Sequence, residues 1–407
     1  MLTRRVRSRA PAARAPQSSV AGALAGVQVL DFTIVMSGPM CTRMLADAGA
    51  DVVKVEPPEG DVARQRGPLR GGISAYYGSL NCGKRSLVLD LSQAEGRRIA
   101  RELAARCDVL VENFRPGVMQ RLGLDYAALA AINPRLVYAS ISGYGQTGPR
   151  AALPAYAPVI HAASGCDLAN AEYQRDSSRP PNNGIFLADV LGASYAFGAI
   201  QLALFERERS GRGQHIDVAL LDSVLGMLVY EILAAQFPPA RRRQLYEPVR
   251  AADGWVMVAA VTAKNQQALF DVIGRPDAKQ DPRFATLAAK EAHWGELLQL
   301  IEGWTRARSS EECERLLTAA GVPCSRYRSV AEAMADPQLA ERGFFAELGE
   351  GESRFRCANQ PYLLSRTPTH ARAVLAALGE HGTAVLREKL GFDDAQIAQL
   401  RAQRVLG

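Results

Sequence analysis

The chain has 407 residues, 48% hydrophobic and 22% charged, the composition of an ordinary soluble globular protein. Because this length exceeds one typical core, we expect two domains. The formal net charge of +6 is mostly local, since an acid-free N-terminal tail carries Arg4, Arg5, Arg7, Arg9 and Arg14. The nearly neutral remainder excludes the basic surface of a nucleic-acid-binding protein, and no window reaches the roughly 18 uninterrupted apolar residues of a membrane span.

The tail, residues 1–24, is rich in Arg, Ala, Pro and Ser, and we expect it to be disordered. A mitochondrial transit peptide has the same composition. Arg greatly outnumbers Lys along the whole chain, which favours an extension of a bacterial protein. We therefore expect a cytoplasmic bacterial protein, with the mitochondrial matrix as the alternative. The seven cysteines and five histidines are scattered without ligand spacing, so we expect neither disulfides nor a metal site.

From Val27 onward, apolar strands alternate with helices, which is typical of a parallel sheet covered on both faces. The predicted strands are 27–32, 51–56, 108–112, 135–140 and 215–219. The predicted helices are 40–48, 92–106 (opened by a Ser92–Glu95 capping box), 189–210 and 222–237. The expected fold class is α/β, with an open, parallel, doubly wound (Rossmann-like) large domain and a smaller α+β domain.

The domain boundaries follow from breaks in this pattern. Pro238, Pro239 and the basic run 241–243 interrupt the chain before a strand at 254–260. We expect a large domain at 25–225, a linker at 226–245 and the small domain at 246–345. Residues 346–407 are expected to return and pack their helices on the large domain.

The loops that follow the first four predicted strands carry most of the special residues, at 33–39, 56–58, 113–117 and 142–149. Ligands bind at this edge of an open parallel sheet. A dinucleotide site would need G-x-G-x-x-G after the first strand, where the chain has Ser37-Gly38-Pro39 instead. The P-loop pattern is also absent, so the sequence predicts a ligand crevice without either phosphate cradle.

Asp189 stands at the start of a long apolar segment, which makes it the most informative single residue. Asp is common as the cap of a helix N-terminus. A carboxylate at the positive end of a helix dipole is also placed to act as a nucleophile. The residues alone leave both interpretations open.

A series of short motifs resembles one enzyme family from about Gly26 to the C-terminus. The motifs are Val29–Phe32, Ser37–Pro39, Leu45–Pro58, Asn81–Ser86, Val111–Gly117, Ser142–Pro149, Ser210–Gln214, Asp253–Trp255, Asp281–Thr286 and Gly321–Pro323. In this order they resemble the class III CoA-transferases of the CaiB/BaiF type, which include carnitine-CoA and formyl-CoA transferases.

The resemblance implies an acyl-CoA:carboxylate CoA-transferase with Asp189 as the catalytic residue. The Asp189 carboxylate would attack an acyl thioester to give a mixed anhydride, and the CoA thiolate would then form an aspartyl-CoA thioester. Many relatives use succinyl-CoA and dicarboxylic acids, so we expect such substrates. CoA and acyl-CoA are substrates here, with no permanently bound cofactor, and the family fold implies an interlocked homodimer.

The resemblance also implies which residues hold the substrates. Contacts to CoA are expected from Val35, Met36, Leu89, Asn113, Phe114, Arg115 and Arg121, and a substrate pocket from Tyr156 and Tyr144. An arginine suits the phosphates of CoA because it donates paired, charge-assisted hydrogen bonds. Formyl-CoA transferases carry a glycine run where this chain has 246–250, which disfavours formyl and oxalate chemistry.

Two alternatives remain open. Acyl-CoA racemases of the same family need a His and an Asp on either side of the α-carbon. Here Tyr156 and Ala157 stand at the place of the His and the usual following acid, and His161, five residues on, is expected to pack or hydrogen-bond locally. The other alternative is a non-catalytic CoA-binding protein, which retention of Asp189 disfavours.

Overall fold

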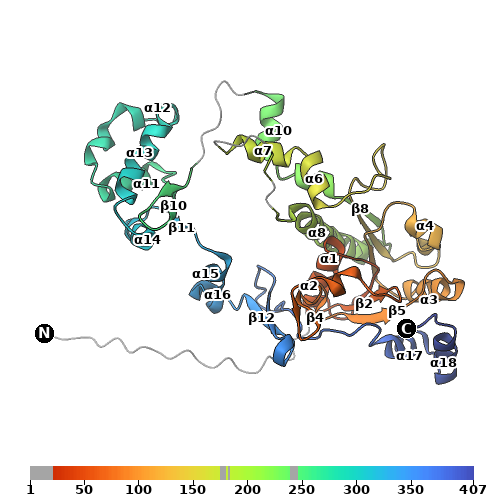
Figure 1. Cartoon of the computed structure of the whole chain (residues 1–407). Coiled ribbons are helices and arrows are strands. Elements are labelled where there is room, and N and C mark those ends of the chain that lie inside the picture. The colour runs from red at the N-terminus through yellow and green to blue at the C-terminus, as the bar shows by residue number, and fades with distance from the viewer. Residues whose placement is uncertain (1–21, 175–179, 182–183, 239–245) are drawn as a thin grey trace. The chain divides into compact units, whose positions relative to one another are not determined.

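Six parallel strands form the largest sheet of the protein, which we describe from a computed structural model (Figure 1). The order across the sheet is β5-β2-β1-β6-β7-β8. The strands are β1 (Gln28–Asp31), β2 (Asp51–Glu56), β5 (Arg85–Val88), β6 (Val109–Glu112), β7 (Val137–Ser142) and β8 (His215–Ala219). The predicted parallel α/β sheet is confirmed, and its strand order reverses direction between β1 and β6, as in doubly wound folds.

The structure describes residues 22–174, 180–181, 184–238 and 246–407. By contacts the chain divides into a large unit, Met1–Val229 with Gly343–Gly407, and a small unit, Tyr230–Arg342. The sequence predicts that the large domain ends at 225 and that the small domain runs from 246 to 345. Residues 1–21 of the predicted tail and 239–245 of the predicted linker lie outside the described residues. Leu24, assigned to the tail, has a fixed place, since its N–H donates to the Ala48 carbonyl at 2.9 Å.

Apolar side chains cover both faces of the large sheet because neighbouring residues of a buried strand point to opposite sides. Val29 of β1 packs in one core cluster and Leu30 in the other. The first cluster holds α1 (Ser37–Asp47), α6 (Ala157–Ala163), α8 (Leu187–Ser210) and α9 (Leu220–Leu225). The second holds α3 (Ala94–Ala104), α4 (Val118–Leu122), α5 (Tyr126–Ala130), α17 (Gly382–Leu390) and α18 (Asp394–Ala402).

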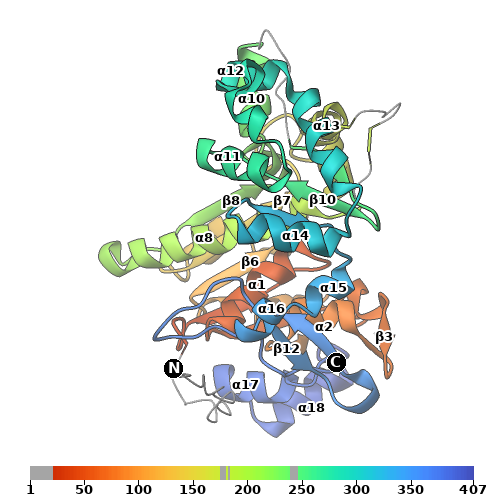
Figure 2. The ribbon, with the colours of Figure 1, turned by 90° about the vertical axis from the view of Figure 1, so that its left-hand side faces the viewer.

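The C-terminal segment therefore belongs to the large unit. A two-stranded antiparallel ribbon, β12 (Phe345–Leu348) with β13 (Phe355–Ala358), precedes α17 and α18, which lie beside the C-terminus in both views (Figures 1 and 2). Leu406 forms an isolated bridge to Leu89, directly after β5. The end of the chain thus covers the β5 side of the sheet.

Helix α8 is 24 residues long and unusually apolar. Among the described helices it alone is long and apolar enough to cross a membrane by length and composition. One side of α8 packs in the core of the large unit through Ala193, Ala196 and Ile200. Gly192 permits this packing, because a Cβ there would lie 2.3 Å from the side chain of Leu220 on α9. The first turn of α8, with Asp189, is thereby fixed against the sheet.

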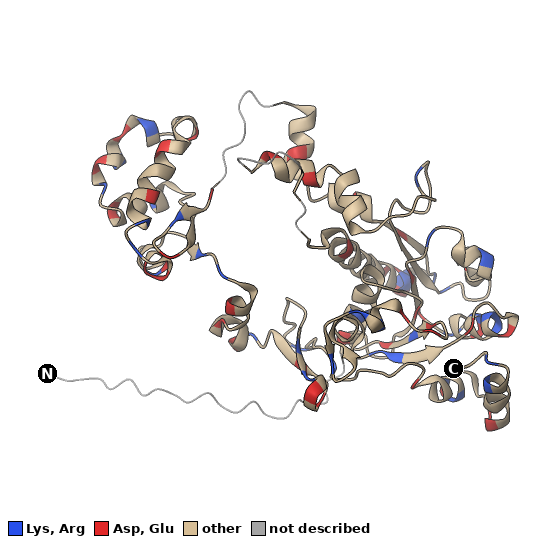
Figure 3. Cartoon of the chain, in the orientation of Figure 1, with Lys and Arg blue, Asp and Glu red and all other residues tan. Residues whose placement is uncertain are grey.

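The small unit has its own sheet and core. Its antiparallel order is β11 (Cys324–Arg326), β10 (Trp255–Val258) and β9 (Val249–Arg250). Helices α11 (Ala263–Val272), α13 (Trp294–Thr305) and α14 (Ser310–Ala319) contribute to the same core cluster. Along the described chain as a whole, acidic and basic residues are interspersed (Figure 3).

Two local predictions are wrong. The N-cap of α3 is Gln93, and Ser92 instead donates its hydroxyl to Asp90 at 2.6 Å, so no Ser92–Glu95 capping box forms. The predicted helix 222–237 is broken: α9 ends at Leu225, and α10 (Val229–Gln236) begins after a turn at Gly226. In the first place the Asp90 side chain binds the Ser92 hydroxyl, and in the second the turn at Gly226 ends the helix.

Buried charges link the strands to the loops at the carboxyl edge of the sheet. The Lys54 ammonium on β2, 1% exposed, donates to the Thr33 carbonyl at 2.6 Å and pairs with Asp61 at 3.1 Å. The equally buried Lys84 pairs with Asp31 at 3.0 Å. Buried charges persist only when partners replace the lost water. These pairs therefore hold the loop after β1 to its neighbours.

We expect Lys54→Met to lower the free energy of unfolding by about 3–5 kcal/mol, because it leaves a buried carboxylate without its counter-charge. Urea unfolding followed by circular dichroism measures the change. Arg212→Met, which shortens an exposed basic side chain of the same unit, is the matched control and should change stability by less than about 0.5 kcal/mol. Equal losses in the two variants would contradict the assignment.

Candidate active site

A cavity of about 340 Å³ opens at the carboxyl ends of the strands in the large unit. It lies where the strand order reverses, between the loops that follow β1 and β6, and this is where doubly wound sheets bind ligands. Among the predicted site residues, those that line it are Val35, Met36, Asn113, Phe114, Arg115, Tyr156 and Asp189. The structure thus brings together residues that lie more than 150 positions apart in the sequence.

Three predicted site residues are not among the described residues that line this cavity. Leu89 is fully buried in a core cluster. Arg121 is exposed on α4, and Tyr144 accepts a hydrogen bond from Arg150 at 3.2 Å. Their assignment to CoA or substrate stays a prediction. The side chain of Leu89 belongs to the core, although its backbone lies at the carboxyl end of β5, the edge of the sheet where ligands bind.

The loop after β1 is held in a conformation that a branched residue rarely adopts. Val35 has φ of +68°, in the left-handed region. Its N–H donates to Asp61 at 3.4 Å, while the Asn113 amide accepts from the Ile34 N–H and donates to the Ile34 carbonyl, both at 2.8 Å. Such strain persists where the surroundings over-determine the backbone, often at functional sites.

Asp189 is the third residue of α8, and Phe186 occupies the N-cap position. The interpretation of Asp189 as the N-cap is therefore wrong, and the carboxylate is free for another role. Burial raises the pKa of Asp189 to about 6, although hydrogen bonds from the Ser37 hydroxyl and N–H lower it, as does the charge of Arg66. At neutral pH the side chain is mostly an ionised, partly desolvated carboxylate.

The N-terminus of a second helix also faces Asp189. Helix α1 begins at Ser37, whose N–H is one of the donors to Asp189. Helix N-termini carry unpaired N–H groups and partial positive charge. Gly38 lets the start of α1 pack closely against Thr33 and Asn113. A Cβ at position 38 would lie 2.3 Å from the Thr33 side chain and 3.1 Å from the Asn113 side chain. Two helix starts thus stabilise negative charge around Asp189.

His161 does not line the cavity. It is 5% exposed, and its Nε2 accepts the Ala188 N–H at 3.1 Å, as expected for a histidine that packs and hydrogen-bonds within the fold. It thereby satisfies one N–H of the first turn of α8, next to Asp189. Tyr156, by contrast, is 68% exposed at the cavity rim. The described cavity lining contains no histidine to form a racemase pair with Asp189.

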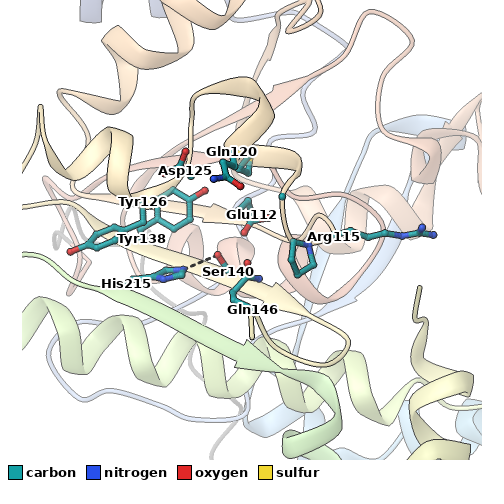
Figure 4. A pocket seen from close by; sticks show the side chains of 12 residues that line it. Glu112, Arg115, Gln120, Asp125, Tyr126, Tyr138, Ser140, Gln146 and His215 are labelled. Carbon is teal, nitrogen blue, oxygen red and sulfur yellow. Dashed lines mark hydrogen bonds between the residues drawn. The ribbon is translucent and has the colours of Figure 1, made fainter. Parts of the chain in front are cut away.

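A second pocket of about 230 Å³ adjoins the first through Arg115 (Figure 4). In the close-up, Arg115 points away from the rings of Tyr126, Tyr138 and His215. Ser140 lies 3.0 Å from His215 Nε2. Burial raises the pKa of Glu112 to about 7, while its carboxylate accepts the Phe114 N–H at 2.8 Å. Glu112 therefore orders the loop that carries Asn113, Phe114 and Arg115.

Several residues of the site were predicted only as members of a loop, or not at all. Ser37 was recognised only as part of a motif, although it hydrogen-bonds Asp189. The cavity lining also includes Ser142 at the end of β7, Gly143 directly after it and Leu220 at the start of α9. Ser142 and Gly143 belong to the loop at 142–149 that the sequence assigned to the ligand crevice, although neither was named as a site residue. No local signal joined Ser37 to Asp189, because their contact depends on the packing of α1 against α8.

The protein resembles known sequences along most of its length. The model of CoA-transferase family III matches residues 24–382. Succinate–glutarate CoA-transferase of Agrobacterium fabrum is 36% identical over 383 residues, 90% of this chain and 95% of that protein. Acetyl-CoA:oxalate CoA-transferase of Acetobacter aceti is 37% identical over 377 residues, 90% of this chain and 96% of that protein.

Solved structures agree with these sequence matches. A CAIB/BAIF family protein from Brucella suis superposes with a TM-score of 0.79 at 33% identity, covering 91% of this chain and 100% of that one. A protein from Mycobacterium tuberculosis gives 0.81 at 29% identity, covering 90% and 100%. The family model covers residues 24–382, and the Agrobacterium and Acetobacter relatives are both CoA-transferases, so the chain belongs to CoA-transferase family III and is a CoA-transferase.

Proposed function

We propose that the protein moves CoA from an acyl-CoA, such as succinyl-CoA, to a dicarboxylic acid through an aspartyl-CoA thioester on Asp189. The observation that carries this proposal is the place of the Asp189 carboxylate, in the wall of the cavity at the strand-order reversal. The relatives named above act on different acids at 36% and 37% identity, so identity alone does not select the acid. The residues of the site must therefore indicate which acid the protein uses.

Each step uses a group of this chain. The ionised Asp189 attacks the thioester carbonyl, the C–S bond breaks, and an acyl-aspartyl anhydride and a CoA thiolate result. The thiolate attacks the Asp189 carbonyl of the anhydride, which releases the donor acid as a carboxylate. An acceptor carboxylate then reverses both steps. The Ser37 N–H and hydroxyl, which bond the Asp189 carboxylate, are placed to stabilise oxygens that gain charge.

The cavity walls suit an acyl-CoA. Val35, Met36 and Phe114 supply apolar surface for the pantetheine arm, and Asn113 supplies an amide. Arg115, exposed at the rim, has the bidentate geometry that phosphate favours. We assign Arg121, exposed on the neighbouring α4, to the phosphates as well. No metal or bound cofactor takes part in these steps.

We expect the wild-type protein, incubated with succinyl-CoA and then hydroxylamine, to carry a hydroxamate on Asp189, detected by peptide mass spectrometry. Asp189→Ala should lose the adduct and lower kcat by at least about 1,000-fold, as for other covalent nucleophiles. Asp222→Ala is the matched control, because Asp222 also lies in the first turn of a helix but is exposed. An unmodified Asp189 together with exchange of the α-proton into deuterated water would support a racemase instead.

The pH dependence follows from the ionisation of Asp189. Only the carboxylate attacks, so kcat/KM for the acyl-CoA should fall about tenfold per pH unit below the pKa of about 6. Ser37→Ala removes a hydrogen bond that lowers this pKa, and the acid limb should therefore move to higher pH. Ser194→Ala, at an exposed serine of α8, should leave it in place. A limb that stays unchanged in Ser37→Ala argues against titration of Asp189.

We also propose that the protein is a homodimer in the bacterial cytoplasm. The relatives named above are bacterial. The outer part of α8 exposes Leu202 (72%) and Phe205 (66%). Large exposed apolar side chains on neighbouring positions mark a surface that a partner covers. A second copy of this chain is the occupant that the family fold implies.

Light scattering coupled to size exclusion should therefore give about twice the chain mass of 43.9 kDa. Leu202→Asp should shift the protein toward the monomer, because it places a charge in an apolar interface. Leu287→Asp, at a comparably exposed leucine (67%) of the small unit, is the control and should leave the mass unchanged. A wild-type protein that elutes as a monomer at micromolar concentration would exclude the dimer.

A further inference from the structure

We propose that Lys84 is a positioning residue for the reaction, because its buried ammonium fixes the first turn of α1 and so holds Ser37 against the Asp189 carboxylate. This inference rests on the proposed function and deepens it, since it names a group that acts on the nucleophile through another residue. Lys84 lies between α2 (Ala75–Asn81) and β5 and is 2% exposed. It is not among the described residues that line the cavity.

Oxygen atoms from three elements surround the Lys84 ammonium. It donates to the Asp31 carboxylate at the end of β1 at 3.0 Å and to the Asn81 side-chain carbonyl at the end of α2 at 2.8 Å. On α1 it donates to the Pro39 carbonyl at 2.9 Å and to the Thr42 hydroxyl at 2.7 Å. A buried ammonium needs such partners because it has lost its water. Lys84 therefore joins β1, α2 and the start of α1 at one point.

The Asp31 carboxylate completes this junction. Its Oδ2 also accepts the Thr42 hydroxyl at 2.7 Å. Its Oδ1 accepts the Thr33 hydroxyl at 2.5 Å and the Thr33 N–H at 2.8 Å, in the loop after β1. The side chains of Asp31, Thr33 and Thr42 are all fully buried. The start of α1 is thus tied to the strand and to the loop that precede it.

The charged form of Lys84 prevails at neutral pH. Burial lowers the pKa of Lys84 to about 8, and the like charge of Lys54 on β2 lowers it as well. The carboxylates of Asp31 and Asp61 act in the opposite direction. The contacts to α1 are therefore made by an ammonium group with Asp31 as its counter-charge.

The first turn of α1 depends on this junction because its own N-cap supplies no side-chain bond. Met36 occupies the N-cap position without a side-chain hydrogen bond to the helix. Pro39 has no N–H, so the donors that the turn offers are the N–H groups of Ser37 and Gly38. Ser37 hydrogen-bonds Asp189, and both residues line the same cavity. A displaced first turn would move these donors away from the carboxylate.

The acid limb of kcat/KM for succinyl-CoA is the main readout, because the bonds from Ser37 lower the pKa of Asp189. Losing them raises that pKa and moves the limb to higher pH. We expect Lys84→Met to move the limb upward by about 0.5–1 pH unit and to lower kcat at pH 7 about 10-fold. A limb that stays in place would overturn the proposal.

A double-mutant cycle tests whether the effect passes through Ser37. In a Ser37→Ala background, Lys84→Met should move the limb by less than it does in the wild type, because one of the two bonds from Ser37 is already lost. Equal shifts in both backgrounds would mean that Lys84 acts on Asp189 by another route, and they would overturn the proposal.

Two further variants separate positioning from stability and from charge. Asp31→Asn/Lys84→Met removes both charges together, which buried pairs often tolerate, and leaves the net charge unchanged. Its melting temperature should largely recover while the shifted limb remains. A limb that recovers together with stability would leave Lys84 only a structural or electrostatic role. Thr42→Val removes the hydroxyl between Lys84 and Asp31 without changing any charge, and it should move the limb upward by a smaller amount even if the Lys84 variants fail to fold.

Lys389→Met is the matched control. Lys389 also pairs with an aspartate of the large sheet, Asp51 at 2.7 Å, but at the opposite edge, where β2 begins. The limb should stay in place in this variant. A shift as large as that in Lys84→Met would make the effect unspecific and contradict the assignment.

Infrared difference spectra recorded across the pH range provide a readout independent of turnover. The band of the protonated Asp189 carboxyl is identified by its absence in Asp189→Ala, and it should titrate at higher pH in Lys84→Met than in the wild type. An Asp189 adduct with unchanged titration in Lys84→Met would retain the proposed function and overturn this inference. A shifted titration without any adduct would retain the positioning role and reject the covalent mechanism.

Discussion

The buried Lys54 ammonium is the contact on which the geometry of the site depends. It joins the loop after β1, through the Thr33 carbonyl, to Asp61 in the segment after β2. Asn113, from the loop after β6, holds the adjacent Ile34 by two hydrogen bonds. Val35 keeps its left-handed backbone only because both neighbours constrain it. The three loops at the strand-order reversal thus form one rigid frame, and a lost charge pair would loosen all of them.

Within this frame, opposing effects set the protonation state of Asp189. Burial favours the neutral acid, whereas Ser37 and the nearby helix N-termini favour the carboxylate. The balance leaves a pKa of about 6, high enough for a good nucleophile and low enough for ionisation at neutral pH. An ordinary surface aspartate would be ionised but strongly solvated. A more deeply buried one would be protonated, so the intermediate position of Asp189 suits covalent catalysis.

The sequence predicted the parallel sheet because buried strands appear as apolar runs between helical segments, and it placed the Asn113–Arg115 loop at the ligand-binding edge. It could not predict which face a side chain takes: Leu89 follows a strand, yet its side chain packs in the core. The short strand β5 was missed because half of its four residues, Arg85 and Ser86, are polar. Ser37 meets Asp189 through tertiary packing that no local pattern encodes.

The segment between β2 and β5 supports the site without lining its cavity. The loops after β1 and β6 line the cavity that we assign to CoA, whereas this segment reaches the β1 loop through Asp61, which accepts the Val35 N–H. The buried pairs of Asp61 and Glu56 anchor the segment at its start. The backbone of Val35 in the cavity wall therefore depends on a charge pair, Lys54 with Asp61, that lies outside the cavity lining.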